Sequence, residues 1–180
     1  MGNITLITGG AGSGKTRWAI SYFKTCDNVL FLNTAKNLHE DTRHRLEYSN
    51  KENNVEWVVA NDVKNPVDYI KDHKFFIFDN LGSYTSNVMR EVAADEENIT
   101  PEEKEQIRKI VVDSVIECMN KVSQLNGAMV IVTIEPGFSP CPKDKAQLYF
   151  REIMGAVNQR IANTAQEVYL SASGIQFRIK

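Results

Sequence analysis

The chain has 180 residues, of which 42% are hydrophobic and 24% are charged, and its formal net charge is −2. This length is enough for a domain with its own core, and the near-neutral charge excludes a general electrostatic attraction to nucleic acid or to anionic membranes. No apolar run approaches the roughly 20 residues of a membrane span, no basic-then-apolar leader opens the chain, and the three cysteines form no C-x-x-C pair, so we expect a cytoplasmic protein without disulfides or a zinc site.

Short apolar segments alternate with longer segments of helical periodicity along the chain. We expect strands over residues 3–8, 29–34, 55–59, 75–79 and 128–134, and helices over residues 15–24, 40–49, 67–72, 83–92, 101–124 and 143–164. Several of these strands are almost entirely apolar, as in "VLFLNT" and "AMVIVTI", which is typical of strands covered on both faces. The alternation predicts an α/β fold with a mostly parallel sheet flanked by helices.

Two local signals add detail to this prediction. Thr100, Pro101 and Glu103 supply an N-cap, a proline in the first helical position and a capping box, and together they predict the start of the longest helix. The closing segment "EVYLSASGIQFRIK" has two alternating halves around Ser173-Gly174. That pattern predicts a C-terminal β-hairpin.

The segment "LITGGAGSGKT" carries the clearest chemical signal. It contains the complete pattern G-x-x-x-x-G-K-[ST] between a predicted strand and a predicted helix, as a phosphate-binding loop (P-loop) requires. Glycines let successive N–H groups turn toward phosphate oxygens, and the following helix directs its positive N-terminus at the same anion. The residues expected to hold the nucleotide are Gly9, Gly10, Ala11, Gly12, Ser13, Gly14, Lys15 and Thr16. Because no linker or repeat divides the chain, we expect residues 1–180 to form a single P-loop domain.

Two carboxylates follow apolar strands that should be parallel: Asp79 ends "FFIFD", and Glu135 follows "VIVTI". The carboxyl ends of parallel strands share one edge of the sheet, so both side chains should lie near the P-loop. In this position Asp79 would join the Thr16 hydroxyl in holding Mg²⁺, while Lys15 would reach the β- and γ-phosphates. Glu135 is a candidate for work on the second substrate or on the metal, and a capping or loop role remains the alternative for both carboxylates.

Several segments together resemble the bifunctional adenosylcobinamide kinase/adenosylcobinamide-phosphate guanylyltransferase family of cobalamin biosynthesis. The resemblance begins at "ITLITGGAGSGKTRWA" and continues through "VLFLNTA", "EDTRHRLEYSN" and "FIFDNLGSYTSNVM". The most specific segment is "FREIMGAVNQRIANTAQEVYLSASGIQFRIK", because it carries the pattern FR[DE]-x-x-G-x-x-NQR-x-A and the terminal S-G-I…K. The similarity therefore extends over essentially the whole chain.

This resemblance implies two reactions and an assembly. A nucleoside triphosphate, ATP or GTP, would phosphorylate the aminopropanol hydroxyl of adenosylcobinamide, and GTP would then donate GMP through an enzyme histidine to the phosphorylated corrinoid. The resemblance also implies a RecA-like P-loop fold and a homotrimer whose neighbouring subunits help to build the sites. Through the matching motifs, Arg17, Arg151 and Arg160 become candidate contacts to the nucleotide.

One departure from the family concerns the guanylylated histidine. An alignment without gaps places Tyr48 and Ser49 where the family carries its histidines, and His44 lies four residues earlier, on almost the same face of the helix. A neutral imidazole is a capable nucleophile near pH 7, whereas a phenol with a pKa of about 10 needs activation. His44 and Tyr48 are therefore both candidates for the nucleotide acceptor, and the resemblance alone leaves guanylyl transfer open.

Two other functions remain compatible with the residues. A P-loop kinase or nucleotidyltransferase could act on a different small-molecule alcohol, and a nucleotide-binding switch protein could use the same loop with little chemistry. Base recognition in this fold lies outside the glycine loop, so the motif does not choose between ATP and GTP.

Overall fold

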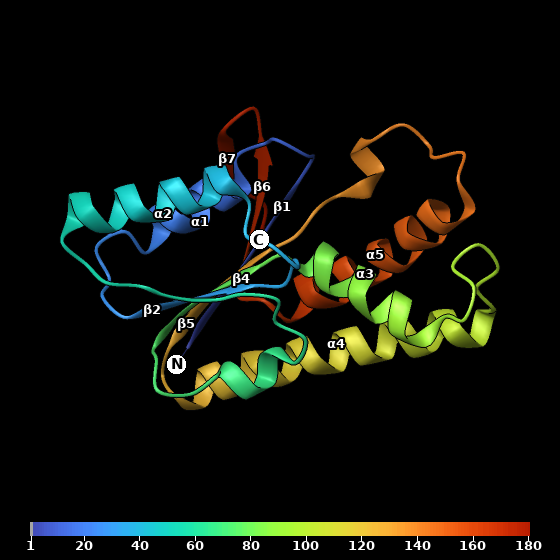
Figure 1. Ribbon diagram of the computed structural model, residues 1–180, viewed down its shortest axis with the longest axis horizontal. Coiled ribbons are helices and arrows are strands. Elements are labelled where there is room, and N and C mark those ends of the chain that lie inside the picture. Colours follow the sequence, from blue (N-terminus) through green and yellow to red (C-terminus); the bar gives the residue numbers. More distant parts are fainter. Residues whose placement is uncertain (1) are drawn as a thin grey trace.

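One seven-stranded sheet, seen nearly edge-on in Figure 1, forms the centre of the computed structural model, which describes residues 2–180. All neighbouring strands are parallel except the last pair, which forms an antiparallel hairpin. From one edge to the other, the strands are β3 (Val58–Ala60), β2 (Val29–Asn33), β4 (Phe75–Asp79), β5 (Ala128–Val132), β1 (Asn3–Gly9), β6 (Glu167–Ala172) and β7 (Ile175–Arg178). The predicted α/β fold and the predicted hairpin are confirmed.

Helices cover both faces of this sheet, which explains why its central strands are apolar on both sides. The helices α1 (Lys15–Tyr22) and α2 (Glu40–Asn53) lie over one face, and α3 (Leu81–Val92), α4 (Pro101–Gln124) and α5 (Lys145–Thr164) lie over the other (Figure 1). The capping box predicted at Thr100 is present, since its side chain accepts from the Glu103 N–H and the Glu103 carboxylate accepts from the Thr100 N–H.

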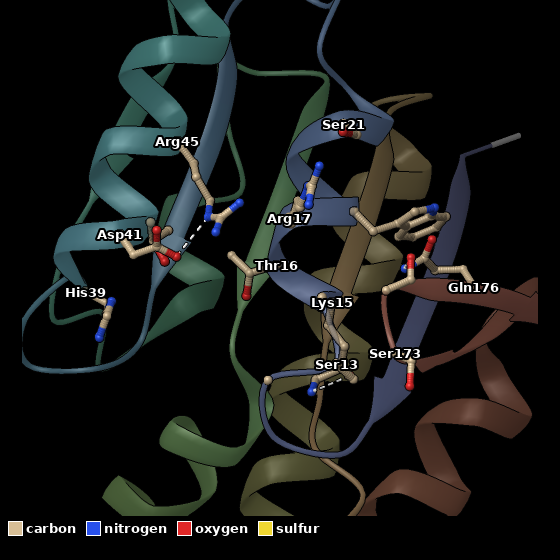
Figure 2. Close-up of a pocket in the computed structure, with 15 residues that line it drawn as sticks. Ser13, Lys15, Thr16, Arg17, Ser21, His39, Asp41, Arg45, Ser173 and Gln176 are labelled. Carbon is tan, nitrogen blue, oxygen red and sulfur yellow. Dashed lines mark hydrogen bonds and ion pairs between the residues drawn. The ribbon is translucent and has the colours of Figure 1, made fainter.

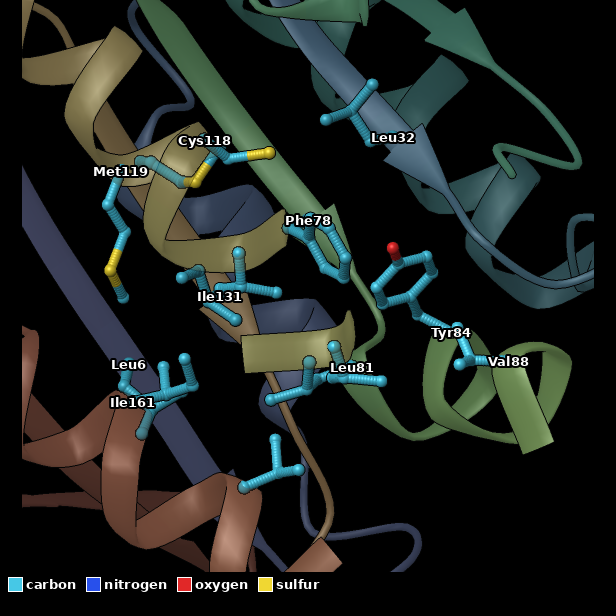
Figure 3. Close-up of a cluster of buried hydrophobic side chains, with 14 of the residues drawn as sticks. Leu6, Leu32, Phe78, Leu81, Tyr84, Val88, Cys118, Met119, Ile131 and Ile161 are labelled. Carbon is cyan, nitrogen blue, oxygen red and sulfur yellow. The ribbon is translucent and has the colours of Figure 1, made fainter. Parts of the chain in front are cut away.

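Each central strand contributes to two separate cores, because successive side chains point to opposite faces. In β1, Leu6 packs on the side of α4 and α5, whereas Ile7 packs on the side of α1. Figure 3 shows the larger core, where Leu6 lies with Phe78, Ile131 and Ile161 between the sheet and its helices. A sheet fixed from both sides in this way gives the loops at its carboxyl edge a rigid base.

Two predicted elements differ from the structure. The helix expected over residues 67–72 is only a single 3₁₀ turn, η1 (Pro66–Tyr69). Pro66 starts this turn, but Ile70 leaves the helical region with a ψ of 79°, and the positive φ of 57° at Asp72 prevents a helix from resuming. The strand expected over residues 55–59 is β3 at Val58–Ala60. It starts later than expected because Asn54 is still the left-handed cap of α2, and only Val58–Ala60 pair with Leu30–Leu32 of β2.

The other boundaries agree with the predictions to within a few residues. The helix expected at 83 begins at Leu81, because the Asn80 side chain caps it by accepting from the Ser83 N–H at 2.8 Å. The short 3₁₀ turn η2 (Pro136–Phe138) follows β5 and was not predicted. No helix within residues 2–180 is long and apolar enough to cross a membrane.

Candidate active site

The strand order brings the P-loop and Asp79 to the same edge of the sheet. Strand β5 lies between β1 and β4, and its Val132 is level with Ile7 on one side and with Asp79 on the other. The P-loop therefore leaves β1 two strands away from Asp79. This arrangement is the one expected for the carboxyl edge of a parallel sheet, where ligands bind.

Lys15 is folded back onto its own loop. Its Nζ donates to the carbonyl oxygens of Gly9 and Gly10 at 3.0 and 2.6 Å, and lies 3.4 Å from the Ser13 Oγ. The side chain is only 8% exposed, and this burial lowers its pKa, while the negative charge of Asp79 acts in the opposite direction. These carbonyl contacts satisfy the buried ammonium group.

Asp79 lies opposite Lys15 and contacts the first turn of α1. The Thr16 Oγ1 donates toward its two carboxylate oxygens at 3.2 and 3.3 Å. Asp79 is 8% exposed, and burial raises its pKa from 3.8 to about 6, even though the hydrogen bond from Thr16 and the charge of Lys15 lower it. The carboxylate thus sits in an environment that resists its negative charge and favours a cation beside it.

The same pair of residues fits a magnesium ion. Mg²⁺ prefers oxygen ligands, keeps several waters, and commonly uses one or two protein carboxylates together with substrate phosphates. Thr16 and Asp79 offer such oxygens side by side. No group of three or more His, Cys, Asp or Glu side chains within residues 2–180 could hold a metal by itself. The geometry therefore fits a metal that arrives with a phosphate ligand.

A cleft of about 880 Å³ opens beside the P-loop, within the range of roughly 300–1,000 Å³ that is usual for small-molecule sites. Figure 2 shows α2 on one side, the β6–β7 turn on the other, and Thr16 and Arg17 between them. Of the predicted nucleotide-binding residues, the cleft is lined by Gly12, Ser13, Gly14, Lys15, Thr16 and Arg17. Gly9, Gly10 and Ala11 lie behind, at the junction with β1.

Sequence reasoning missed two walls of this cleft. The start of α2 contributes His39, Asp41 and Arg45, and Arg45 Nε donates to Asp41 at 2.8 Å. The hairpin contributes Ser173, Gly174 and Gln176, with Ser173 at a positive φ of 51°. Asp41 and Arg45 are four residues apart on a helix, and this spacing is a sequence signal for their ion pair. No local pattern shows that the C-terminal hairpin packs beside the P-loop.

A second groove, of about 580 Å³, continues from the cleft between α1 and α2. His44 and Tyr48 both line it, as does Arg17, so the shared face predicted from their spacing is confirmed. The His44 side chain is 66% exposed with its Nε2 4.0 Å from Glu40, and Tyr48 is 67% exposed. Both candidate nucleophiles are therefore accessible from the groove between α1 and α2.

Glu135 follows β5 beside the start of the P-loop and is not among the residues that line the cleft. Its N–H donates to the Gly9 carbonyl at 3.1 Å, and its carboxylate accepts from the Gly137 N–H at 3.4 Å. The buried Asn158 of α5 fixes the preceding residues, since it donates to the Ile134 carbonyl at 2.8 Å and accepts from the Thr133 hydroxyl at 2.7 Å. The asparagine of the "NQR" motif therefore anchors the segment that carries Glu135.

The two arginines of α5 do not line the P-loop cleft. Arg151 Nη1 donates to the Ser139 carbonyl at 3.3 Å and holds the loop between η2 and α5. Arg160 is exposed on the outer surface of the helix. Within one chain, the structure brings Arg17 to the cleft and leaves Arg151 and Arg160 outside it.

Comparisons with known proteins agree with this geometry. The model of the family described as cobinamide kinase / cobinamide phosphate guanyltransferase matches residues 5–179. A bifunctional adenosylcobalamin biosynthesis protein of Escherichia coli (strain K12) is 27% identical over 181 residues, which cover 97% of this chain and 98% of the relative. The protein of the same name from Salmonella typhimurium is 26% identical over 182 residues, with the same coverage.

A solved structure supports the fold separately. A KaiC-like protein from Pyrococcus horikoshii OT3 matches with a TM-score of 0.51 and 15% identity, over 93% of this chain and 71% of that chain. At this identity the likeness concerns the fold alone. Together with the strand order and the intact P-loop, it confirms the predicted RecA-like P-loop fold.

The raised pKa of Asp79 leads to a prediction about stability. Because the folded protein binds this proton more tightly than the unfolded chain, stability without nucleotide should fall as pH rises from about 4 to about 6. Replacing Asp79 with Asn removes the buried charge, so Asp79→Asn should be more stable than the wild type above pH 6, by up to about 3 kcal/mol. This advantage should shrink toward zero below about pH 4.

Urea unfolding at pH 5 and pH 7.5, without Mg²⁺, would measure this difference. Asp113→Asn, on an exposed position of α4, is the matched control and should change the midpoint little at either pH. An Asp79→Asn variant no more stable than the wild type at pH 7.5 would contradict the argument.

Proposed function

The chain belongs to the cobinamide kinase / cobinamide phosphate guanyltransferase family, and from this premise we propose that it phosphorylates adenosylcobinamide with a nucleoside triphosphate. The observation that carries the proposal is the juxtaposition of Lys15 and Thr16, which line the cleft, with the buried Asp79, which accepts from the Thr16 hydroxyl. A buried ammonium group, a hydroxyl and a buried carboxylate meet where a P-loop presents its N–H groups. This combination suits the binding of a triphosphate with its metal and has no evident structural use.

In the proposed kinase step, the P-loop amides and Lys15 hold the triphosphate so that its γ-phosphorus faces the acceptor. Lys15 would exchange its contacts with the Gly9 and Gly10 carbonyls for phosphate oxygens. Thr16 and Asp79 would hold Mg²⁺, which would neutralise part of the phosphate charge. Catalysis then rests mainly on positioning and on charge stabilisation.

The acceptor hydroxyl oxygen forms a bond to the γ-phosphorus in line with the bridging oxygen, the bond between that oxygen and the γ-phosphorus breaks, and a nucleoside diphosphate leaves. The hydroxyl proton needs an acceptor, and we assign this role to Glu135. In support, Glu135 follows the strand that separates the P-loop from Asp79, its N–H donates to the Gly9 carbonyl, and Asn158 fixes the two residues before it.

Guanylyl transfer is the second proposed activity, with His44 as the acceptor of GMP. A ring nitrogen of His44 would attack the α-phosphorus of GTP. A P–N bond would form, the bond from the α-phosphorus to the oxygen that bridges it to the β-phosphate would break, and pyrophosphate would leave. Two observations favour this role: His44 lines the groove that continues from the cleft, and Arg17 and Arg45 border both spaces. Tyr48 lies in the same groove but would need activation of its phenol.

We further propose that the chain assembles as a homotrimer in the cytoplasm. Strand β7 is the edge of the sheet, and Ile175 and Phe177 within it and Ile179 just after it are each more than half exposed. An exposed apolar edge of this kind favours pairing with another copy. Arg151 and Arg160, which lie outside the cleft of their own chain, would be available to a neighbouring subunit.

A cobinamide-dependent assay tests the kinase proposal. Purified protein with Mg²⁺ and ATP or GTP should consume triphosphate only when cobinamide is present. Lys15→Ala should lower the rate by about 100-fold or more, because the variant loses a buried charge in the phosphate site. Lys64→Ala, which removes an exposed lysine paired with Asp62, should leave the rate unchanged. Rapid triphosphate hydrolysis without acceptor would argue for another function.

Labelling with α-phosphate-labelled GTP tests the transferase proposal. We expect a covalent, acid-labile label that is retained in Tyr48→Phe and lost in His44→Ala, since both side chains are exposed and their removal should not disturb the fold. A label lost only in Tyr48→Phe would assign the acceptor to the tyrosine. No label from a protein with cobinamide-dependent activity would make it a kinase alone.

Measurement of the mass in solution tests the assembly. The wild type should have three times the chain mass of 20.4 kDa, and Phe177→Asp should dissociate because it places a charge in the apolar edge. Arg178→Ala is the matched control, since Arg178 is the next residue of β7 and pairs with Glu167 of its own chain. A wild type of 20.4 kDa at micromolar concentration would exclude the trimer.

A further inference from the structure

The C-terminal hairpin holds one carbonyl group of the P-loop. The Ser171 Oγ donates to the Ser13 carbonyl oxygen at 2.7 Å, and the Gly174 N–H donates to the same oxygen at 3.1 Å. These two bonds join segments about 160 residues apart in sequence, as the separation of 158 between Ser13 and Ser171 shows. Two donors on one carbonyl satisfy both of its lone pairs and fix its direction.

The direction of this carbonyl decides the direction of the next N–H. The Ser13–Gly14 peptide is trans. In a trans peptide the C=O and the following N–H point in opposite directions. Since the Ser13 C=O points at the hairpin, the Gly14 N–H points away from it. Within residues 2–180 that N–H donates to no protein acceptor, as expected of a group reserved for an anion.

The hairpin is held close to the loop by the residues around this contact. Gly9 allows the approach, because a Cβ at its position would lie 2.3 Å from the Ser171 carbonyl oxygen. The Ser171 side chain is 1% exposed, and its Oγ receives a further bond from Gln176 Nε2 at 3.3 Å. Gln176 also donates to the Gly174 carbonyl at 3.1 Å, so one side chain braces both donors.

We propose that Ser171 is a positioning residue for nucleotide binding, which acts by aiming the Gly14 N–H at the phosphates through the Ser13 carbonyl. Residues Ser171, Gly174 and Gln176 form this hairpin clamp. The proposal deepens the nucleotide site described above and rests on it. Ser171 itself need not touch the ligand.

Repulsion between carbonyl oxygens and phosphates explains why a fixed Ser13–Gly14 peptide favours nucleotide binding. Gly14 has a φ of 95° and Gly12 a φ of 68°, so glycines on both sides of Ser13 let the loop adopt several backbone conformations. A rotated Ser13–Gly14 peptide would turn a carbonyl oxygen toward the phosphates, where two partial negative charges repel. Donation to the Ser13 carbonyl excludes that rotation, and it also polarises the peptide so that its N–H becomes a better donor.

The test compares Ser171→Ala with the wild type, using calorimetry with Mg²⁺. The probes are ATP, GTP and inorganic tripolyphosphate, which has the phosphates without a base or sugar. Ser171→Ala should weaken all three by a similar factor of about three to ten, the worth of one hydrogen bond. Ser171→Thr keeps the hydroxyl donor and should bind as the wild type does. Thr5→Ala removes a buried hydroxyl from neighbouring β1 and should not alter binding.

A second measurement distinguishes an effect on the orientation of the P-loop from a loss of stability of the whole sheet. Hydrogen exchange at residues 10–15 should become faster in Ser171→Ala, while exchange in β4 and β5 should match the wild type. The same exchange measurement shows whether Ser171→Ala is poorly folded, because exchange would then be faster throughout the sheet.

Unchanged tripolyphosphate affinity in Ser171→Ala would overturn the proposal, and a loss confined to ATP and GTP would then mean a contact to the base or sugar. Uniformly faster exchange across the sheet would show a stability effect only and would also overturn it. None of these measurements uses cobinamide, so a failure of the clamp is distinct from a failure of the proposed kinase activity.

Discussion

The site depends on one electrostatic constraint: a buried ammonium group and a buried carboxylate must coexist around a space meant for phosphates. Lys15 is satisfied by the Gly9 and Gly10 carbonyls, and Asp79 by the Thr16 hydroxyl, so neither is left without a partner. Both pKa values are nonetheless displaced in the direction that burial dictates. Such an arrangement is less stable than an apolar one would be, and this cost is what a triphosphate with its metal would relieve.

The sheet supplies the rigidity that this constraint needs. Because β5 lies between β1 and β4, the P-loop and Asp79 are held at a fixed separation by three strands that are packed on both faces. The hairpin extends the same sheet beyond β1 and returns to the loop through Ser13. The flexible glycines of the P-loop are therefore surrounded by rigid elements, and a preorganised anion site needs that support.

The sequence was informative wherever a local pattern had a local cause. The central strands, the capping box at Thr100 and the turn at Ser173-Gly174 each follow from residues close in the chain, and each is present. The short turn at Pro66 was overpredicted as a helix, because periodicity says little about where the backbone leaves helical φ and ψ, as it does here at Ile70. The hairpin's contact with the P-loop and the wall formed by α2 arise from tertiary packing, and no window of sequence contains both partners.

The two proposed activities differ in how firmly the fold constrains their residues. Lys15 and Asp79 are buried and partnered, so a substitution there changes both the site and the stability of the protein. The residues proposed for guanylyl transfer lie on α2, a polar helix that buries only Leu46 and Ser49, and Tyr48 is largely exposed. Exchange of a histidine for a tyrosine at such a position costs the fold little. The scaffold can therefore keep the phosphate site while the nucleophile moves along the helix or is lost.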